Sequence, residues 1–324
     1  YQISNFIMYN KIVCLFSAPY TFLNIKDNFK IKNIKFILNE IWKKKHLRYY
    51  KNVSAWIVNP GQNFIIDNNI LKYFPKLKVI ITPSTGVNHI NKEECLKKNV
   101  KVFSLLENKK ELKNIHASSE YTFLMILNSF RRFDRAIEEI DNERWRDREN
   151  FLRGEEIHSK KIGLIGLGRI GSNLGKWLKL FGAEVSYYDP FSNSKNFIKK
   201  SLAKIFEDSN LVCICCTLNK NTKHMIDINS LKKLKKKAIL VNTSRGEIIN
   251  EADLIKFLKI REDIFYTADV MSNETTGRQF NSKLIKLHKK RRILLSPHIA
   301  GATIESQVKA AKISIQILKK FFTK

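Results

Sequence analysis

The sequence predicts an α/β protein built from two doubly wound parallel sheets. Short runs rich in Val and Ile alternate with helix-like segments along the chain, and one of these units carries a glycine-rich turn between strand and helix. A chain of 324 residues is also too long for one small domain. We therefore expect two compact domains, each with a parallel sheet covered by helices on both faces.

The first half of the chain predicts a compact unit without a glycine fingerprint of its own. Strands are expected at 11–16, 53–58, 78–81 and 100–104, and helical segments at 34–42, 69–74 and 92–99. This alternation is typical of strands that are joined by helices in a parallel sheet.

The segment 161–190 carries the glycine-rich turn. It reads KIGLIGLGRIGSNLGKWLKLFGAEVSYYDP and predicts a strand, a turn, an amphipathic helix and a second strand. Gly166 permits a tight turn, Gly168 leaves room for a pyrophosphate against the backbone, and Gly171 lets the helix pack close to the strand. The segment is typical of a dinucleotide-binding unit.

Three further positions of this unit bear on the nucleotide. The backbone amides around Arg169 and Ile170, at the start of the helix, are expected to face the phosphates. Asp189 ends the second strand, where its carboxylate can accept hydrogen bonds from a ribose diol. A 2′-phosphate would meet a like charge there, so Asp189 favours NAD over NADP.

The remaining elements follow the same alternation. A long helix is expected from a cap at Ser118 or Ser119 to about residue 140, with an apolar centre that is buried, partly against another subunit. An irregular stretch, 141–154, follows it with Trp145 as an anchor. Further strands are expected at 211–216, 238–242, 264–269 and 293–296, and helices after Asn250 and at 303–322.

The chain is strongly basic, with 59 Lys and Arg against 30 Asp and Glu, a net charge of +29. A nucleic-acid or membrane-surface partner is one interpretation. The lysines are scattered among Asn and Ile, which indicates compositional bias, so we expect neither nucleic acid nor membrane as a partner. Cys213, Cys215 and Cys216 share one apolar run and predict buried thiols of a cytoplasmic protein and no metal site.

Polar residues follow three strands of the second half. Arg245 comes after 238–242, Asp269 ends 264–269 and Glu274 follows it, and His298 follows 293–296. Ligands of parallel sheets bind beyond the carboxyl ends of the strands, so these four side chains can face one site. A histidine can take or give a proton near neutral pH, and an arginine can bind a carboxylate in a two-pronged way.

Four ordered motifs, GLGRIG, VNTSRG, DVMSNE and SPHIAGAT, resemble the NAD-dependent D-isomer-specific 2-hydroxyacid dehydrogenase family. The resemblance covers nearly the whole chain. It implies a Rossmann-type NAD-binding domain at 115–299 and a flavodoxin-like substrate domain at 1–114, completed by 300–324, with a cleft between them. It also implies hydride transfer between NAD(H) and a small 2-hydroxy or 2-keto acid, and a homodimer.

The resemblance implies a role for each residue of the site. Arg245 binds the substrate carboxylate and carbonyl, Glu274 orients the histidine, and His298 is the acid and base. The implied substrate loop is Ser84, Thr85 and Gly86, which offers backbone amides to the carboxylate. The implied cofactor residues are Gly166, Gly168, Arg169, Ile170, Gly171, Asp189, Thr243 and Asp269, the last on the nicotinamide carboxamide.

Several positions depart from the family pattern and leave the substrate open. Asn88 and Asn91 stand where the substrate loop often has Asp, and Thr275 follows Glu274 where Pro is usual. Phosphoglycerate, hydroxypyruvate and glyoxylate are the substrate types we expect. The alternative is an NAD-sensing, corepressor-like binding protein without significant turnover. His89 is either a substrate contact or, as we prefer, a solvated loop residue.

Overall fold

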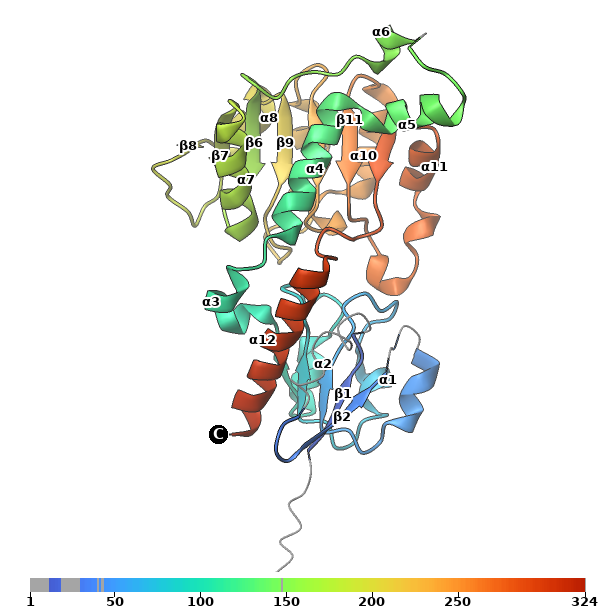
Figure 1. Ribbon diagram of the computed structural model, residues 1–324, viewed down its shortest axis with the longest axis vertical. Coiled ribbons are helices and arrows are strands. Elements are labelled where there is room, and N and C mark those ends of the chain that lie inside the picture. Colours follow the sequence, from blue (N-terminus) through green and yellow to red (C-terminus); the bar gives the residue numbers. More distant parts are fainter. Residues whose placement is uncertain (1–11, 19–29, 40, 42–43, 147, 324) are drawn as a thin grey trace, which may run out of the picture. The chain divides into compact units, whose positions relative to one another are not determined.

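The computed structural model describes residues 12–18, 30–39, 41, 44–146 and 148–323 (Figure 1). The chain divides into two compact units. Unit 1 comprises 1–115, 275–277 and 303–324, and unit 2 comprises 116–274 and 278–302. Each has its own parallel sheet, which confirms the predicted fold class.

Unit 1 contains a five-stranded parallel sheet of order β2-β1-β3-β4-β5, the order of flavodoxin-like folds. Its strands are β1 (Ile12–Phe16), β2 (Ile34–Leu38), β3 (Ala55–Ile57), β4 (Val79–Ile81) and β5 (Lys101–Phe103). Its helices are α1 (Asn68–Leu71), α2 (Lys92–Lys97), α3 (Lys109–Leu112) and α12 (Ile304–Phe322), with short 3-10 turns η3 (Lys44–Tyr49) and η4 (Leu105–Asn108).

Helix α12 returns the C-terminal part of the chain to unit 1. Thr303 caps it, accepting from the Ser306 amide at 3.1 Å while Ser306 returns a bond to the cap backbone. Its apolar face packs on one side of the sheet, and Trp56, Ile80 and the residues of α1 line the core on the other. Burial on both faces explains why these strands consist almost entirely of apolar residues.

Unit 2 contains a seven-stranded parallel sheet of order β12-β11-β10-β9-β6-β7-β8, the Rossmann order with one added strand. Its strands are β6 (Lys161–Ile165), β7 (Glu184–Tyr188), β8 (Ile198–Lys199), β9 (Leu211–Ile214), β10 (Ile239–Asn242), β11 (Phe265–Ala268) and β12 (Ile293–Leu295). Its helices are α4 (Ala117–Arg131), α5 (Phe133–Asp141), α6 (Glu149–Leu152), α7 (Arg169–Leu180), α8 (Leu202–Asp208), α9 (Ile228–Lys232), α10 (Glu251–Ile260) and α11 (Lys283–Lys289), with turns η5 (Gly246–Ile248), η6 (Glu274–Thr276) and η7 (Gln279–Asn281).

Two apolar layers enclose this sheet. Helices α4 and α7 supply one layer, and α8 to α11 supply the other. In Figure 1, α4 crosses the sheet on the side that faces the viewer. Asn250 caps α10 as predicted, accepting from the Asp253 amide at 3.3 Å. The two layers hold the strand ends, and therefore the loops after them, in fixed positions.

Two of the predicted helices are wrong in part. Residues 34–38, expected as helix, form strand β2, because Ile34 to Leu38 pair in parallel register with Ile12 to Phe16. A short apolar run fits either element, and only the partner strand decides. The long helix expected to residue 140 ends at Arg131, since Arg132 is left-handed (φ 50°) and starts α5. His116, not Ser118 or Ser119, occupies the cap of α4.

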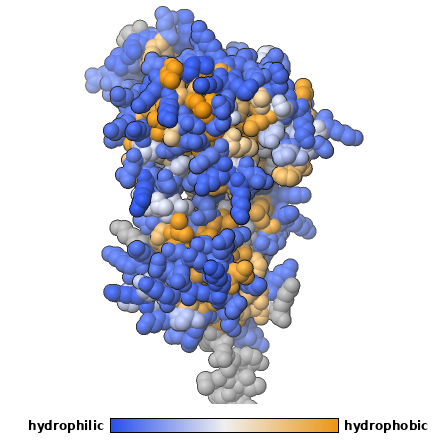
Figure 2. Space-filling view, turned by 180° about the vertical axis from the view of Figure 1, so that it is seen from behind, coloured by the Kyte–Doolittle hydropathy of each residue, from blue (hydrophilic) through white to orange (hydrophobic). Residues whose placement is uncertain are grey.

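Trp145, expected as an anchor, is 75% exposed in the single chain. Leu124, in the apolar centre of α4, is 57% exposed, so its expected burial against another subunit stays a prediction. Hydrophilic residues cover most of the face shown in Figure 2, with hydrophobic residues gathered in separate patches. Within the residues that the structure describes, no helix is both long and apolar enough to cross a bilayer.

Candidate active site

The glycine turn joins β6 to α7. The Gly166 amide donates to the Tyr188 carbonyl at 2.8 Å, and Gly166 has φ 98°, a backbone that L side chains rarely adopt. A Cβ at Gly171 would overlap the Gly166 carbonyl oxygen, so only glycine lets α7 start this close to the strand. A Cβ at Gly168 would meet nothing within 4 Å, so the turn is open on that side.

The geometry of this turn fits a dinucleotide. The 12-residue helix α7 begins at Arg169, and its first amides lie directly beyond the open side of Gly168. Burial lowers the pKa of the Arg169 guanidinium. The structure thus brings Gly166, Gly168, Arg169, Ile170 and Gly171 together at one turn, where the sequence predicts the phosphates.

Asp189 lies at the end of β7 and is tied to the same turn. Its Oδ2 accepts from the Leu167 amide at 2.8 Å, and its Oδ1 accepts from the Phe191 amide at 2.8 Å. These two bonds fix the carboxylate beside the glycine turn, at the position expected for a ribose ligand.

Arg245 follows β10 and is half-buried. Its Nη1 donates to the Ser244 carbonyl at 2.6 Å, and the Asn242 side chain donates to the Arg245 carbonyl at 3.0 Å. Burial lowers the pKa of Arg245, while Glu274 and Glu247 act in the opposite direction. An arginine stays charged under such shifts, so the site keeps a fixed cation for a carboxylate.

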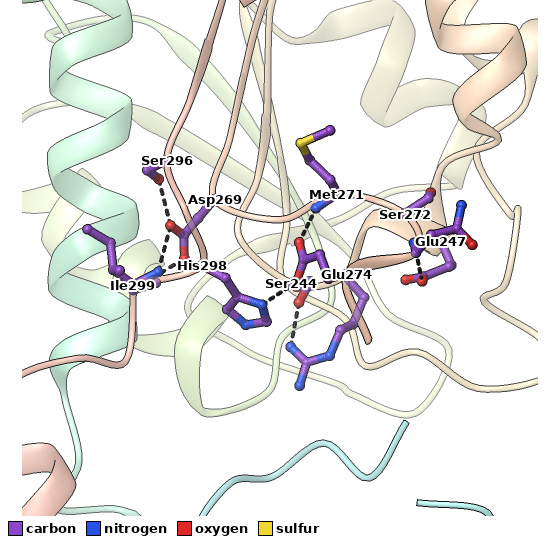
Figure 3. A network of polar contacts seen from close by, with 12 residues as sticks. Ser244, Glu247, Asp269, Met271, Ser272, Glu274, Ser296, His298 and Ile299 are labelled. Atoms are coloured by element: carbon purple, nitrogen blue, oxygen red, sulfur yellow. Dashed lines mark hydrogen bonds and ion pairs between the residues drawn. The ribbon is translucent and has the colours of Figure 1, made fainter. Parts of the chain in front are cut away.

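Glu274 and His298 are hydrogen-bonded to each other in unit 2, with His298 Nδ1 2.5 Å from Glu274 Oε2 (Figure 3). The other carboxylate oxygen of Glu274 accepts a short hydrogen bond from the Met271 amide. The side chain of His298 is 45% exposed and that of Glu274 is 23% exposed. The carboxylate therefore fixes the ring, while Nε2 remains available for a substrate.

The loop 271–274, which carries Glu274, is held by two carboxylates that sequence reasoning missed. Glu251 accepts from the Ser272 amide at 3.3 Å and from Ser282 Oγ at 2.5 Å, and Glu247 accepts from the Asn273 amide at 3.3 Å. Both glutamates follow Arg245 closely in sequence. The motif VNTSRG indicated Arg245. No spacing rule predicts that the glutamates after Arg245 bind amides more than twenty residues further along the chain.

Asp269, expected at the nicotinamide carboxamide, makes contacts within the protein. It is fully buried, and both of its carboxylate oxygens accept hydrogen bonds from 296–300, the loop that carries His298. Thr243, expected at the cofactor, places its hydroxyl 2.7 Å from that of Thr122 on α4. The structure thus shows that Asp269 and Thr243 make contacts within the protein. Both residues directly follow strands whose carboxyl ends carry the candidate site.

The predicted substrate loop lies in unit 1, after β4. Ser84 Oγ donates to the Gly86 carbonyl at 2.8 Å and lies 2.9 Å from Thr82 Oγ1. Among the residues that the structure describes, no acceptor is recorded for the amides of Ser84, Thr85 and Gly86. The loop therefore presents a set of backbone donors, which is the arrangement an anion requires.

Two further expectations are resolved here. His89 is only 2% exposed, so the expectation of a solvated loop residue is wrong, because 66 and 89–91 pair through their backbones and enclose it. Cys213, in β9, and Cys215, directly after that strand, pack into the same apolar layer, with sulfurs 3.7 Å apart. Burial raises the pKa of the Cys216 thiol to about 12, so this thiol is protonated near neutral pH.

Comparison with known proteins agrees with this geometry. Residues 123–300 match the family model of the D-isomer specific 2-hydroxyacid dehydrogenase NAD-binding domain. A glyoxylate reductase of Thermofilum pendens is 34% identical over 264 residues, which cover 78% of this chain and 74% of the relative. A glyoxylate/hydroxypyruvate reductase of Arabidopsis thaliana is 25% identical over 85% of this chain and 82% of its own.

A solved structure gives the same result. The NAD⁺-bound 3-phosphoglycerate dehydrogenase of Entamoeba histolytica matches with a TM-score of 0.78 and 25% identity over 97% of this chain and 96% of the other. The fold and the histidine–carboxylate pair define an NAD-binding α/β oxidoreductase. The chain belongs to the D-isomer-specific 2-hydroxyacid dehydrogenase family, whose members are NAD-dependent enzymes acting on a CH–OH group. This confirms the resemblance drawn from the four motifs.

Proposed function

We propose that this chain reduces a small 2-keto acid of the glyoxylate or hydroxypyruvate type, with NADH preferred over NADPH. The observation that carries the proposal is the 2.5 Å contact between His298 and Glu274 at strand ends that also present Arg245. The names of two relatives, glyoxylate reductase and glyoxylate/hydroxypyruvate reductase, support this substrate type. NAD binding falls to 115–299 and substrate binding to 1–114, completed by 300–324.

In this mechanism each residue acts on the substrate in a definite way. NADH, when bound, supplies the hydride. The His298 imidazolium gives its Nε2 proton to the keto oxygen, and Glu274 holds the ring by Nδ1. Arg245 binds the substrate carboxylate and stabilises the oxygen that gains charge. The backbone amides of Ser84, Thr85 and Gly86 are further donors for the carboxylate.

A panel of keto acids tests the proposal. Glyoxylate, hydroxypyruvate, pyruvate, 2-ketoglutarate and phosphohydroxypyruvate are each incubated with NADH, and the loss of absorbance at the nicotinamide band is followed. We expect turnover with glyoxylate or hydroxypyruvate. Tight NADH binding without turnover on any of the panel would instead support the corepressor-like alternative, in which the pair of His298 and Glu274 is present but not used.

Asp189 is expected to set the cofactor preference. Its carboxylate is fixed by the amides of Leu167 and Phe191, so it cannot turn away from a 2′-phosphate without losing both bonds. The unmodified protein should give a higher kcat/KM with NADH than with NADPH, and Asp189→Ala should narrow the difference. Lys195, six positions further, is the residue best able to pair with a 2′-phosphate. Equal use of both cofactors by the unmodified protein would show that Asp189 does not discriminate.

We also propose a homodimer that forms through α4 and α5. Phe133, Ile137 and Ile140 lie three or four positions apart on α5, and they are 63%, 49% and 55% exposed. An apolar stripe of this kind on a surface helix is typical of a subunit interface. Light scattering at micromolar concentration should give twice the chain mass. Ile137→Asp should give a monomer with an unchanged circular dichroism spectrum, and a monomeric parent would refute the proposal.

Localisation and partners follow from the same reasoning. All five cysteines are free, which suits a reducing compartment, and we propose the cytoplasm. The small-molecule keto acid and the second copy of the chain are the partners that this proposal requires.

A further inference from the structure

We propose that Asp269 is a positioning residue that holds His298 in its active orientation, and that it acts on catalysis through the histidine and not through the nicotinamide. The inference rests on the proposed role of His298 as the proton donor. It concerns a residue for which the family resemblance implies a different contact, the carboxamide of the cofactor.

Asp269 accepts hydrogen bonds from residues on both sides of His298 in the sequence. Oδ1 accepts from Ser296 Oγ at 2.6 Å and from the Ile299 amide at 2.9 Å, and Oδ2 accepts from the Ala300 amide at 2.8 Å. These donors stand two positions before His298 and one and two positions after it. Figure 3 shows the imidazole between Asp269 on one side and Glu274 on the other. One carboxylate therefore holds a side chain that precedes the catalytic residue and two backbone amides that follow it.

His298 needs this support because its backbone is unfavourable. It has φ 56°, in the left-handed region that non-glycine residues seldom occupy. Such a conformation persists only where the surroundings impose it, and it often occurs at active sites. The amides of Ile299 and Ala300 are the two that follow the left-handed residue, and both are bound by Asp269. The carboxylate therefore stabilises the turn that aims the ring at Glu274.

Asp269 is itself fixed by the sheet. Its amide donates to the Asn242 carbonyl at 3.0 Å, and the Ser296 amide donates to the Ala268 carbonyl at 2.9 Å. These bonds continue the parallel register of β10, β11 and β12 by one residue. Strand β11 therefore fixes the backbone of Asp269, and the carboxylate in turn holds the loop that carries the histidine.

The same contacts leave Asp269 little capacity for a ligand. The residue has no exposed surface, and a carboxylate of two oxygens already accepts three bonds from protein donors. About one acceptor site is left, and the atoms packed around the buried residue would have to move before a carboxamide could reach it. The two roles therefore predict different kinetic results, because one acts on the proton transfer and the other on cofactor binding.

Asp269→Asn tests the inference. Every contact of the carboxylate is to a donor, so the new NH₂ group must face an amide N–H in either orientation. At least one hydrogen bond is therefore lost, and the turn at His298 relaxes. We expect kcat to fall by about 10-fold to 10²-fold, since a shift of about 1 Å in a catalytic group can cost about 10²-fold. The NADH dissociation constant, measured by fluorescence titration, should stay nearly unchanged.

Two further variants make the result specific. Asp263→Asn is the matched control, because it makes the same replacement just before the opposite end of β11. The Asp263 carboxylate pairs with Arg261 at 2.8 Å. The kcat of this variant should equal that of the parent. Ser296→Ala removes one donor to Asp269 and leaves both amides in place, so it should lower kcat less than Asp269→Asn. If Asp269→Asn does not fold, Ser296→Ala decides: an unchanged kcat would contradict the inference.

A double variant separates this inference from the proposed function. In a His298→Ala background, Asp269→Asn should have almost no further effect on kcat if Asp269 acts through the histidine. A full additional loss of kcat would contradict the inference. So would an NADH dissociation constant raised tenfold or more with kcat intact, which would support a contact of Asp269 with the carboxamide of the cofactor. An unchanged kcat for His298→Ala alone would refute the proposed function itself. As a readout independent of activity, the ¹⁵N ring signals of His298 should shift in Asp269→Asn and stay in place in Asp263→Asn.

Discussion

His298→Ala is expected to lower kcat for keto acid reduction by about 10²-fold to 10⁴-fold, the usual contribution of general acid–base catalysis. The ring that gives the proton is lost, while the glycine turn and Asp189, which bind the nucleotide, are untouched. The NADH dissociation constant should therefore stay close to that of the parent. Steady-state kinetics and a fluorescence titration on the same preparation measure both quantities. A loss confined to NADH binding would remove His298 from the proton transfer.

Glu274→Gln is the companion variant, and its signature is how the loss divides between kcat and cofactor binding. The carboxylate lies 2.5 Å from Nδ1 and holds the ring that donates the proton in the reduction. The amide that replaces it holds the ring less firmly, so kcat should fall by less than in His298→Ala, and the NADH dissociation constant should stay close to that of the parent. In a His298→Ala background, Glu274→Gln should have almost no further effect on kcat. A full additional loss there would break the proposed link between the two residues.

The sequence predicted the parts of this structure that local patterns determine. The glycine turn, the strand-end positions of Arg245 and His298, and the cap at Asn250 depend on a few neighbouring residues, and all three appear where they were expected. The family motifs implied the partnership of Glu274 and His298, which are 24 positions apart in the sequence. The structure adds the distance between them and shows which ring nitrogen the carboxylate contacts.

The features that were missed depend on contacts between distant segments. Strand β2 exists because Ile34 to Leu38 pair with β1, and its own residues would suit a helix equally well. The break at Arg132 has no Pro or Gly to mark it. The guanidinium stacks 3.9 Å above the ring of Phe265 and pairs with Asp134, contacts that help hold a left-handed residue in place.

The contacts of Asp269 show the same limit at the active site. A motif can place an aspartate after a strand, but it does not show which way the carboxylate turns or how many donors surround it. Those properties depend on where β12 and the loop after it lie beside β11. Glu247 and Glu251 were missed for a similar reason, since they bind amides of a loop that follows a different strand.

Gly246→Ala is expected to damage the site as severely as a change to a catalytic residue, although glycine carries no reactive group. A Cβ at this position would overlap the backbone of Met271 and Ser272, in the loop that holds Glu274. Neither neighbour is the flexible end of a side chain, so the loop itself must move. A displacement of about 1 Å at a catalytic group can cost about 10²-fold, and we expect a loss of this size in kcat.

A matched glycine substitution distinguishes this local effect from a general loss of folding. A Cβ at Gly301 would lie 3.7 Å from Ser118 Oγ, an ordinary contact, so Gly301→Ala should keep the kcat of the parent much better than Gly246→Ala does. Overpacking costs about 1–3 kcal/mol, so Gly246→Ala should also melt at a lower temperature while remaining folded at 25 °C. Its NADH affinity should change little, because the glycine turn lies on other strands. A Gly246→Ala protein with the kcat of the parent would show that the loop 271–274 can shift without moving Glu274 away from His298.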